Sequence, residues 1–383
     1  MTQVTRPNLD WISLEESCEL LGVSRPTFDK RRKELRLKET QWRGRLWFSR
    51  RQLAERLLPC EPVNLSSSVE LVESSRSRVS QIKRKNHIYD LRSLRSIDSF
   101  GVVCLLCTLI SEKEKISIIH GDSSVCRLLG SVGFFSELVK LRADILGLSR
   151  TPTLGSWIDP AILQPLTSVT YKGSERQAVV ELQKSLGIQG FTSEMGNYVG
   201  WLIGELADNA LTHGKATCYT ITQRIDTSMR RLVIGLGDRG LGIPNTLKAN
   251  PKYSSLSDRQ ALLTAFLPYV SGWGDEYKRG KGLTDVVKIL AGNRGHMRVE
   301  SGGLALQMDF RSEAKIEFVS PMTRSCGTRY SLVLEDQGFR EVSRSEAASY
   351  ITEAMGRIFE QNEQKEQKKT KNSARSKKPK ERA

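Results

Sequence analysis

The feature that most constrains this chain is the stretch 205–214, which places a polar stripe along one face of an otherwise apolar helix. Residues three or four positions apart share a helix face, so two stripes run side by side along this segment. The polar stripe holds Glu205, Asp208, Asn209 and Thr212, and the apolar stripe holds Val199, Leu202, Leu206 and Ala210. We expect the apolar stripe to pack against a core while the polar stripe faces a cleft.

The carboxylate of Glu205 and the amide of Asn209 lie at positions i and i+4 of the polar stripe. Near a hydrated Mg²⁺, such a carboxylate can orient or deprotonate water, and the amide oxygen is a hard ligand for the metal. Acidic stripes are also common on helices as ordinary solvated faces. The pair alone therefore leaves both readings open.

A glycine-rich stretch downstream favours a nucleotide site. Residues 232–237 alternate and are rich in aliphatic side chains, which predicts a strand that runs into Asp238. Because Gly240 and Gly242 follow, bare backbone can close over a base and ribose while the carboxylate accepts a hydrogen bond from an exocyclic amine. Part of this run also matches GxGxxG, but a dinucleotide fold needs a helix to begin there, and the run continues to Pro244 instead.

A second glycine-rich stretch, Gly280, Lys281 and Gly282, opens a segment with the apolar periodicity of a helix. Free N–H groups at a helix N-terminus and the lysine charge can both meet phosphate. The Walker A pattern fails here, because Asp275 occupies its first glycine position and Gly282 stands where serine or threonine is needed.

Together these motifs resemble those of the GHKL ATPases, which share the Bergerat fold, over roughly residues 175–336. The resemblance implies binding of ATP and Mg²⁺, with Glu205 as the general base for hydrolysis and Asn209 as the Mg²⁺ ligand. Thr328 matches a late Gly-Thr pair whose hydroxyl supports the adenine site. The residues expected at the nucleotide are Asn209, Asp238, Gly240, Gly242, Gly280, Lys281, Gly282 and Thr328.

The amino-terminal region predicts two helices and a hairpin. Ser13 with Glu16 three residues later is typical of a capped helix start, and Pro26 suits the first turn of a second, basic helix. Residues 42–48 predict a basic hairpin around Gly44, followed by a helix over 49–58.

This arrangement resembles the winged helix-turn-helix of excisionases and mercury-resistance-type regulators over roughly 10–58. The resemblance implies contact with DNA phosphates and base edges, and a net charge of +16 favours a polyanionic partner. The expected DNA-binding residues are Arg25, Thr27, Lys30, Arg31, Lys33, Arg43 and Arg45. A small protein-binding domain with a solvated basic face is the alternative.

Residues 87–149 alternate between strand-like and helix-like patterns, which predicts a small, mainly parallel sheet. The region resembles the STAS domain of anti-anti-sigma factors through 90–91, 97–99, Gly101 and 132–135, and this implies contact with a protein partner. Ser99 falls where that family has its phosphorylatable serine. The hypothesis of a phosphoacceptor competes with that of a simple helix N-cap.

The sequence as a whole predicts a multidomain α/β protein. The expected regions are a helix-turn-helix domain at 1–60, a linker at 61–86, a STAS-like domain at 87–149, an ATPase domain at 150–340 that forms an α/β sandwich with a mixed sheet, a helix at 341–362 and a basic disordered tail at 363–383. With no apolar run long enough for a membrane and no signal-type start, we expect a cytoplasmic protein, nucleoid-associated if it binds DNA. Whether it forms a homodimer stays open.

The sequence leaves three functions open. The first is an ATP-binding, DNA-binding regulator in which the GHKL domain, through closure of the segment 243–282 over the phosphates, switches conformation or assembly. The second is a protein serine kinase of anti-sigma-factor type that acts on a STAS-like serine. The third is a binding protein that uses ATP only structurally.

Overall fold

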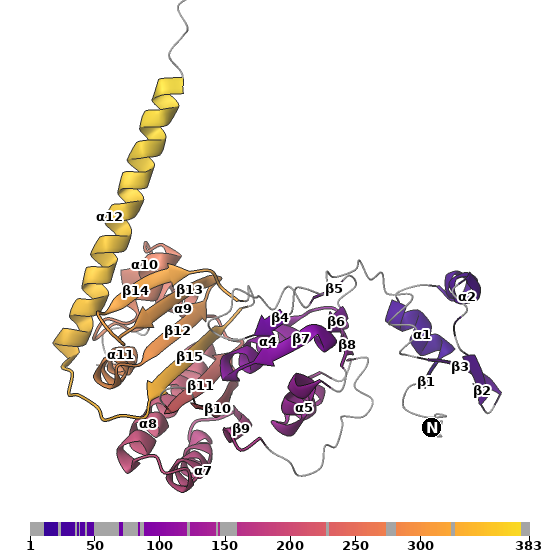
Figure 1. Ribbon diagram of the computed structural model, residues 1–383. Coiled ribbons are helices and arrows are strands. Elements are labelled where there is room, and N and C mark those ends of the chain that lie inside the picture. The colour runs from indigo at the N-terminus through magenta and orange to yellow at the C-terminus, as the bar shows by residue number, and fades with distance from the viewer. Residues whose placement is uncertain are drawn as a thin grey trace, which may run out of the picture. The chain divides into compact units, whose positions relative to one another are not determined.

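The computed structural model describes residues 11–21, 24–34, 37, 39–42, 44–49, 69–71, 83–84, 88–120, 123–142, 145, 159–226, 230–272, 281–322 and 326–376 (Figure 1). The chain divides into two compact units, Met1–Pro160 and Ala161–Ala383. Among the described residues, no helix is long and apolar enough to cross a membrane.

The amino-terminal part of the first unit is a pair of helices with a three-stranded antiparallel sheet of order β1-β3-β2. Its elements are β1 (Trp11–Ser13), α1 (Leu14–Leu21), α2 (Arg25–Glu34), β2 (Glu39–Trp42) and β3 (Arg45–Ser49). The predicted capping box is confirmed, since the Ser13 hydroxyl accepts from the Glu16 N–H at 3.1 Å and a Glu16 carboxylate oxygen accepts from the Ser13 N–H at 2.9 Å. The hairpin around Gly44 is also confirmed. Of the predicted helix 49–58, Ser49 instead ends β3, and 50–58 lie outside the described residues.

The second part of this unit contains two small sheets. Its elements are β4 (Val69–Leu71), β5 (Lys83–Arg84), β6 (Ile88–Asp90), β7 (Leu94–Ile97), α4 (Ser99–Ser111), β8 (Ser117–Ile119), α5 (Ser124–Ser131) and α6 (Phe134–Leu141). Strand β4 pairs in parallel with β7, and β6 pairs in parallel with β8 and antiparallel with β5. The prediction of a plain linker over 61–86 is therefore wrong in part, because β4 and β5 lie inside it and pair with strands of the next region.

Helix α4 is buried on all sides, from Ser99 through most of its length. Its N-cap is Asp98, whose carboxylate accepts a hydrogen bond from the Gly101 N–H at 2.8 Å. The prediction of Ser99 as the N-cap is wrong by one residue, since Ser99 is the first residue inside the helix. Helices α5 and α6 are separated at Gly133, which adopts φ +82° and forms the N-cap of α6.

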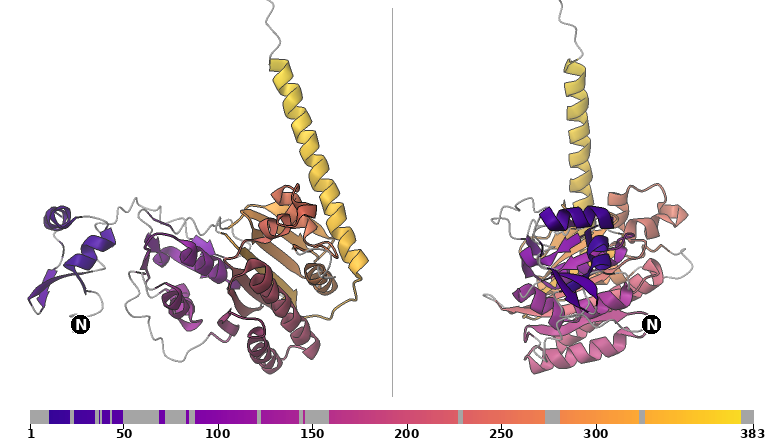
Figure 2. Two further views of the ribbon diagram at one scale, coloured as in Figure 1. Left: turned by 180° about the vertical axis from the view of Figure 1, so that it is seen from behind. Right: turned by 90° about the vertical axis from the view of Figure 1, so that its right-hand side faces the viewer.

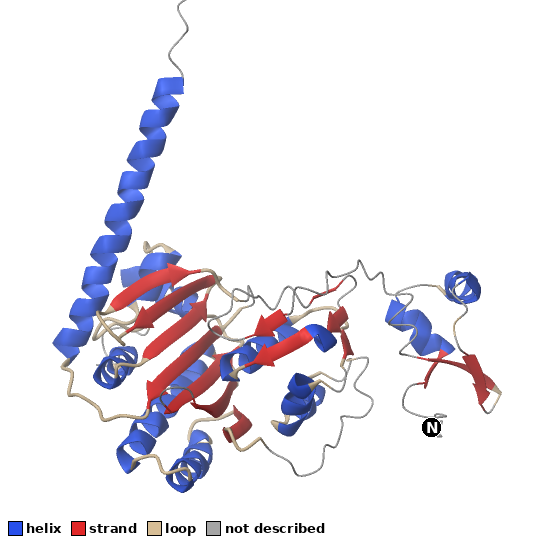
Figure 3. Cartoon of the chain, viewed as in Figure 1, coloured by secondary structure: helices blue, strands red, loops and turns tan. Residues whose placement is uncertain are grey.

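The second unit is built on a seven-stranded sheet of order β14-β13-β12-β15-β11-β10-β9 (Figure 3). Its strands are β9 (Ile162–Val169), β10 (Cys218–Asp226), β11 (Arg230–Asp238), β12 (His296–Ser301), β13 (Leu304–Asp309), β14 (Lys315–Val319) and β15 (Thr328–Glu335). Every neighbouring pair is antiparallel, so the predicted mixed sheet is wrong. Strands β11 and β12 do run in the same direction, but β15 lies between them and is antiparallel to both.

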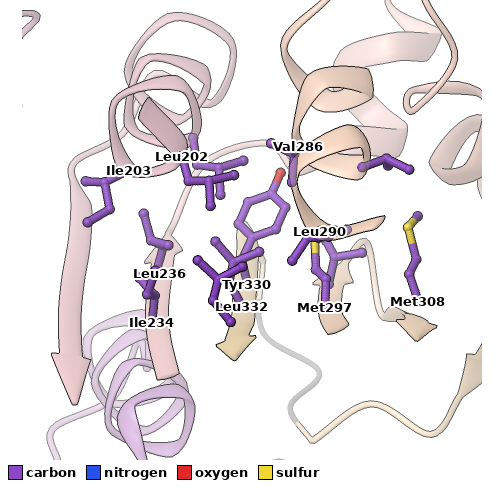
Figure 4. Packing of buried hydrophobic residues seen from close by; sticks show 14 of the residues in the cluster. Leu202, Ile203, Ile234, Leu236, Val286, Leu290, Met297, Met308, Tyr330 and Leu332 are labelled. Atoms are coloured by element: carbon purple, nitrogen blue, oxygen red, sulfur yellow. The ribbon is translucent and has the colours of Figure 1, made fainter. Parts of the chain in front are cut away.

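Helices α7 (Glu175–Ile188), α8 (Ser193–Asn209) and α11 (Gly282–Asn293) pack on this sheet, and α9 (Ile243–Lys248) and α10 (Asp258–Thr264) lie between β11 and α11 in the chain. The predicted apolar stripe is confirmed, because Val199, Leu202 and Leu206 are at most 1 % exposed. Figure 4 shows Leu202 and Ile203 above the strand residues Ile234 and Leu236. Each such side chain contributes about 1.5–3 kcal/mol through burial, and together they fix the rotation of α8, so that its polar stripe faces away from the core.

Helix α12 (Arg344–Ser376) continues well past the position at which the sequence predicts disorder, residue 363 (Figures 1 and 2). Its first turns are docked through Ala347, Ile351 and Ala354, which are fully buried against the core. The later residues are mainly Gln, Lys and Glu, which are strong helix formers. Residues 377–383 lie outside the described residues.

Candidate functional site

A cavity of about 470 Å³ lies in the second unit, between α8, the start of α11, the end of β11 and the α9–α10 segment. Its volume is in the range of small-molecule sites. The predicted site residues that line it are Glu205, Asn209, Asp238, Gly242, Lys281, Gly282 and Thr328. The fold therefore brings residues from four separate sequence stretches to one cavity. The predicted Gly280 lies outside the described residues.

Asp238 ends β11 at one side of the cavity and is only 4 % exposed. Its Oδ1 accepts hydrogen bonds from the Gly240 N–H at 2.6 Å and from the Thr328 N–H at 3.3 Å. Burial raises the pKa of this carboxyl, while the two backbone hydrogen bonds and the charge of Arg329 act to lower it. Because both bonds use Oδ1, Oδ2 is the oxygen that can accept a donor from a ligand.

The glycines beside Asp238 are required by close backbone contacts. A Cβ on Gly240 would lie 2.3 Å from the carbonyl oxygen of Gly214, so these two backbones touch directly. Gly242 adopts φ +79°, a conformation that favours glycine, and a Cβ there would lie 2.9 Å from the Ser301 hydroxyl. Gly242 therefore brings bare backbone to the cavity wall, whereas the predicted Gly240 does not line the cavity and packs against Gly214.

Thr328 lines the cavity, and its backbone and its hydroxyl make separate contacts. Its backbone N–H, rather than its hydroxyl, contacts Asp238. The Thr328 hydroxyl instead lies 3.1 Å from the Ser301 hydroxyl, which also accepts from the Ile243 N–H at 2.8 Å. Ser301 thus ties the end of β12 to the start of α9 and to β15. The sequence gives no sign of this role, because Ser301 is far along the chain from the residues that it joins.

The polar stripe of α8 faces the start of α11. A Cβ on Gly282 would lie 1.6 Å from Glu205 Oε1, so the glutamate side chain occupies the space that any larger residue there would need. Burial raises the pKa of Glu205, the charges of Asp208 and Asp285 raise it further, and Lys172 lowers it. The result is a carboxyl group that is a stronger base than usual.

Asn209 lies one turn after Glu205 and also lines the cavity. Its side-chain Nδ2 is buried and has no hydrogen-bond partner among the residues that the structure describes. Buried polar atoms of this kind are rare and call for a ligand or another partner. The helix then ends in a π-helical turn, Ala210–Gly214, and such turns are frequent at functional sites.

The residues present fit a Mg²⁺ ion bound together with a nucleotide. Mg²⁺ is commonly held by one or two protein oxygens plus phosphates and water, rather than by an all-protein cage. Within the described ranges, no group of three His, Cys, Asp or Glu side chains could hold a metal alone. Asn209, whose amide nitrogen has no partner among the described residues, and the nearby carboxylates of Glu205 and Asp208 can supply the one or two protein oxygens that such a Mg²⁺ site needs.

Several cavity residues are not predicted by the sequence motifs. Trp201, Tyr330, Asp285 and Arg344 all line the cavity. Asp285 lies in the first turn of α11, and the sequence does show an acidic residue at this position. Arg344 belongs to α12, and only the tertiary fold brings it to the cavity.

The predicted sites in the first unit are described only in part. Arg25, Lys30 and Lys33 on α2 and Arg45 on β3 are exposed, whereas the side chains of Thr27, Arg31 and Arg43 lie outside the described set. Ser99, the predicted phosphoacceptor, is fully buried, so its hydroxyl is out of reach of a phosphoryl donor in this conformation.

In comparisons with models of protein families, with curated proteins and with solved structures, nothing matches this chain. The case for a function therefore rests on the geometry of the cavity and on the sequence motifs that it gathers.

Proposed function

We propose that this chain is an ATP-binding, DNA-binding regulatory protein in which binding or hydrolysis of Mg-ATP in the second unit switches conformation or assembly. The observation that carries the proposal is the cavity itself, where a buried carboxylate, bare glycine backbone, a helix N-terminus and an orphaned amide meet. Each of these groups suits a different part of one ligand, a purine nucleoside triphosphate.

Asp238 would recognise the base: its Oδ2 would accept a hydrogen bond from an exocyclic amine, because Oδ1 is already held by two backbone N–H groups. The backbone of Gly242, which lines the cavity, would lie against the flat faces of the base and ribose. The N–H groups at the start of α11, together with Lys281, would receive the phosphates.

Asn209 would hold Mg²⁺ through its amide oxygen, with the unpartnered nitrogen turned to a neighbouring phosphate or water oxygen. The metal, when bound, would neutralise charge on the phosphate oxygens. Glu205 would orient water for attack and accept its proton, a role that its raised pKa favours.

The exposed basic residues of α2 and β3 support DNA as the partner of the first unit. Arg25, Lys30, Lys33 and Arg45 are exposed, so they can reach phosphates without a change of the fold. The overall charge of +16 adds sequence-independent attraction.

Calorimetric titration of the full chain with ATP in magnesium buffer tests the nucleotide site. We expect binding by the parent and at least about tenfold weaker binding by Asp238→Asn, because the new amide nitrogen would face an amine donor instead of accepting from it. Asp226→Asn, at the far end of β10, is the matched control and should bind like the parent. No heat of binding for the folded parent would overturn the proposal.

Incubation with γ-labelled ATP then separates the outcomes of turnover. Free labelled phosphate is expected from an ATPase, whereas labelled protein would indicate a protein serine kinase. If label appears on the chain, comparison with Ser99→Ala decides whether Ser99 is the acceptor.

A further inference from the structure

A cation from outside the nucleotide motifs enters the cavity. Arg344 is the first residue of α12, and its guanidinium makes a two-point contact with Asp285, with Nε 2.8 Å from Oδ1 and Nη2 2.6 Å from Oδ2. Both residues line the cavity. The arginine side chain is 41 % exposed and the aspartate side chain 14 % exposed, so the arginine is the partner that can turn.

The contact lies at the end of the cavity that is assigned here to phosphates. Asp285 is in the first turn of α11, three residues after Gly282. Its charge is also felt by Glu205, which places it close to the carboxylate proposed to activate water. Arg344 therefore lies at the end of the cavity where the proposed function would put the phosphates, rather than the base.

We propose that Arg344 binds the terminal phosphate of ATP and thereby distinguishes ATP from ADP, exchanging the Asp285 carboxylate for the phosphate. The proposal rests on the function proposed above. A guanidinium fork fits a carboxylate and a phosphate in the same two-point geometry, so the exchange requires no new kind of contact. Glu205, Asp208 and Asp285 gather negative charge at this end, and a triphosphate adds more, which makes a cation here necessary for tight binding.

The exchange would also change the contact between α11 and α12. Arg344 begins α12, and the next turns of this helix are fixed by Ala347 and Ile351, both fully buried. When the guanidinium leaves Asp285, the ion pair that joins α11 to α12 is broken, while the buried side chains stay packed. ATP would thus change the stability of the first turn of α12, and ADP would leave it unchanged.

Titrations of the full chain with Mg-ATP and with Mg-ADP test this inference. The parent is expected to bind ATP more tightly than ADP, and Arg344→Gln should bind ATP about tenfold more weakly with ADP binding changed less than twofold. Arg344→Lys keeps the charge but not the fork, so an intermediate loss of affinity is expected. The matched control is Arg340→Gln. Arg340 lies just before α12 and makes a similar two-point pair with Glu346 of that helix, but it does not line this cavity.

The variant Asp285→Asn tests the same exchange by removing the carboxylate that competes with the phosphate for Arg344. Removal of the competing carboxylate should strengthen ATP binding more than ADP binding, and hydrogen exchange at the amides of 344–348 should then no longer differ between the two nucleotides. Equal losses of ATP and ADP affinity in Arg344→Gln, or none, would overturn the inference while leaving the nucleotide site intact. Absence of binding of either nucleotide by the parent would overturn both.

Discussion

Glu205 shows how the fold sets the chemistry of a single residue. The helix position of this glutamate follows from the periodicity of α8, but its raised pKa comes from burial and from two neighbouring carboxylates, of which Asp285 belongs to another helix. A group with a raised pKa takes up a proton at a higher pH than a free glutamate does. Only the ionised form can accept a proton from water, so the pH of the solution should control turnover through this residue.

We expect ATP turnover to fall as the pH decreases, with a midpoint above the ordinary glutamate range, because Glu205 becomes protonated there. Glu205→Gln should retain ATP binding and lower turnover by at least about a hundredfold, which is the usual contribution of a general base. Steady-state phosphate release across pH measures both effects. An unchanged turnover in the glutamine variant would remove Glu205 from the reaction.

The contact between Gly240 and Gly214 gives a second prediction at this scale. Gly240→Ala should lower the free energy of unfolding by about 1–3 kcal/mol, because its Cβ would overlap backbone atoms that cannot move aside. The control is Gly204→Ala in α8, where no atom lies within 4 Å of the new Cβ, and a gain of about 0.5–1 kcal/mol is expected from helix propensity. Urea denaturation measures both changes. Equal effects in the two variants would show that the backbone contact is unimportant.

The residues of the site that the sequence predicts are those in local patterns. Asp238 with its glycines and Glu205 with Asn209 each lie within a few positions of one another, so periodicity and turn chemistry are enough to find them. Such reasoning does not find Ser301 or Arg344. Strand pairing brings Ser301 to the site, and docking of α12 brings Arg344 there, each across a long stretch of chain. Single polar residues in such positions leave no local signal.

At the scale of elements, the types of most helices and strands follow from the sequence but their pairing does not. The sequence predicts the strand at 232–238 and the helix after Gly282, whereas it does not predict the strand directions. A crossover between β11 and β12 suggests a parallel pair, and only the insertion of β15 makes the whole sheet antiparallel. Similarly, Gly133 separates α5 from α6 through a local φ value that the apolar pattern does not reveal.

Helix α4 provides a test of an element boundary. Asp98→Ala should destabilise the part of the chain around α4 by about 1 kcal/mol, because the Gly101 N–H would no longer have its acceptor. Asp98→Asn should cost less, since asparagine caps helices about as well as aspartate does. Hydrogen exchange of the α4 amides measures the local effect. Equal protection of these amides in the alanine variant and the parent would show that the cap does not stabilise the helix.

At the scale of the whole molecule, the two units carry different chemistry. The exposed cations of α2 and β3 belong to the first unit, and the cavity belongs entirely to the second. A regulator would need both, since one unit would hold the target and the other would respond to nucleotide. The sequence predicts this division from composition and motif order, but it does not predict how the units communicate.

DNA binding by the first unit can be tested by charge reversal. The double variant Lys30→Glu with Lys33→Glu should weaken binding in gel-shift titrations and reduce the salt dependence by about one unit of slope for each phosphate that is no longer neutralised. The double variant Lys113→Glu with Lys140→Glu changes the net charge equally at exposed sites away from α2 and should have a smaller effect. Equal decreases in affinity for both doubles would indicate attraction by overall charge alone.

The central place of β15 in its sheet has a consequence for biosynthesis. This strand is made after all its neighbours, yet it separates β11 from β12 and supplies Thr328 and Tyr330 to the cavity wall. A nascent chain that has emerged only as far as β14 therefore lacks the strand that joins the two halves of its sheet, and the backbone N–H and C=O groups of β11 and β12 that pair with β15 stay unpaired. Ligand competence should arise in a single late step, when the final strand joins the two halves.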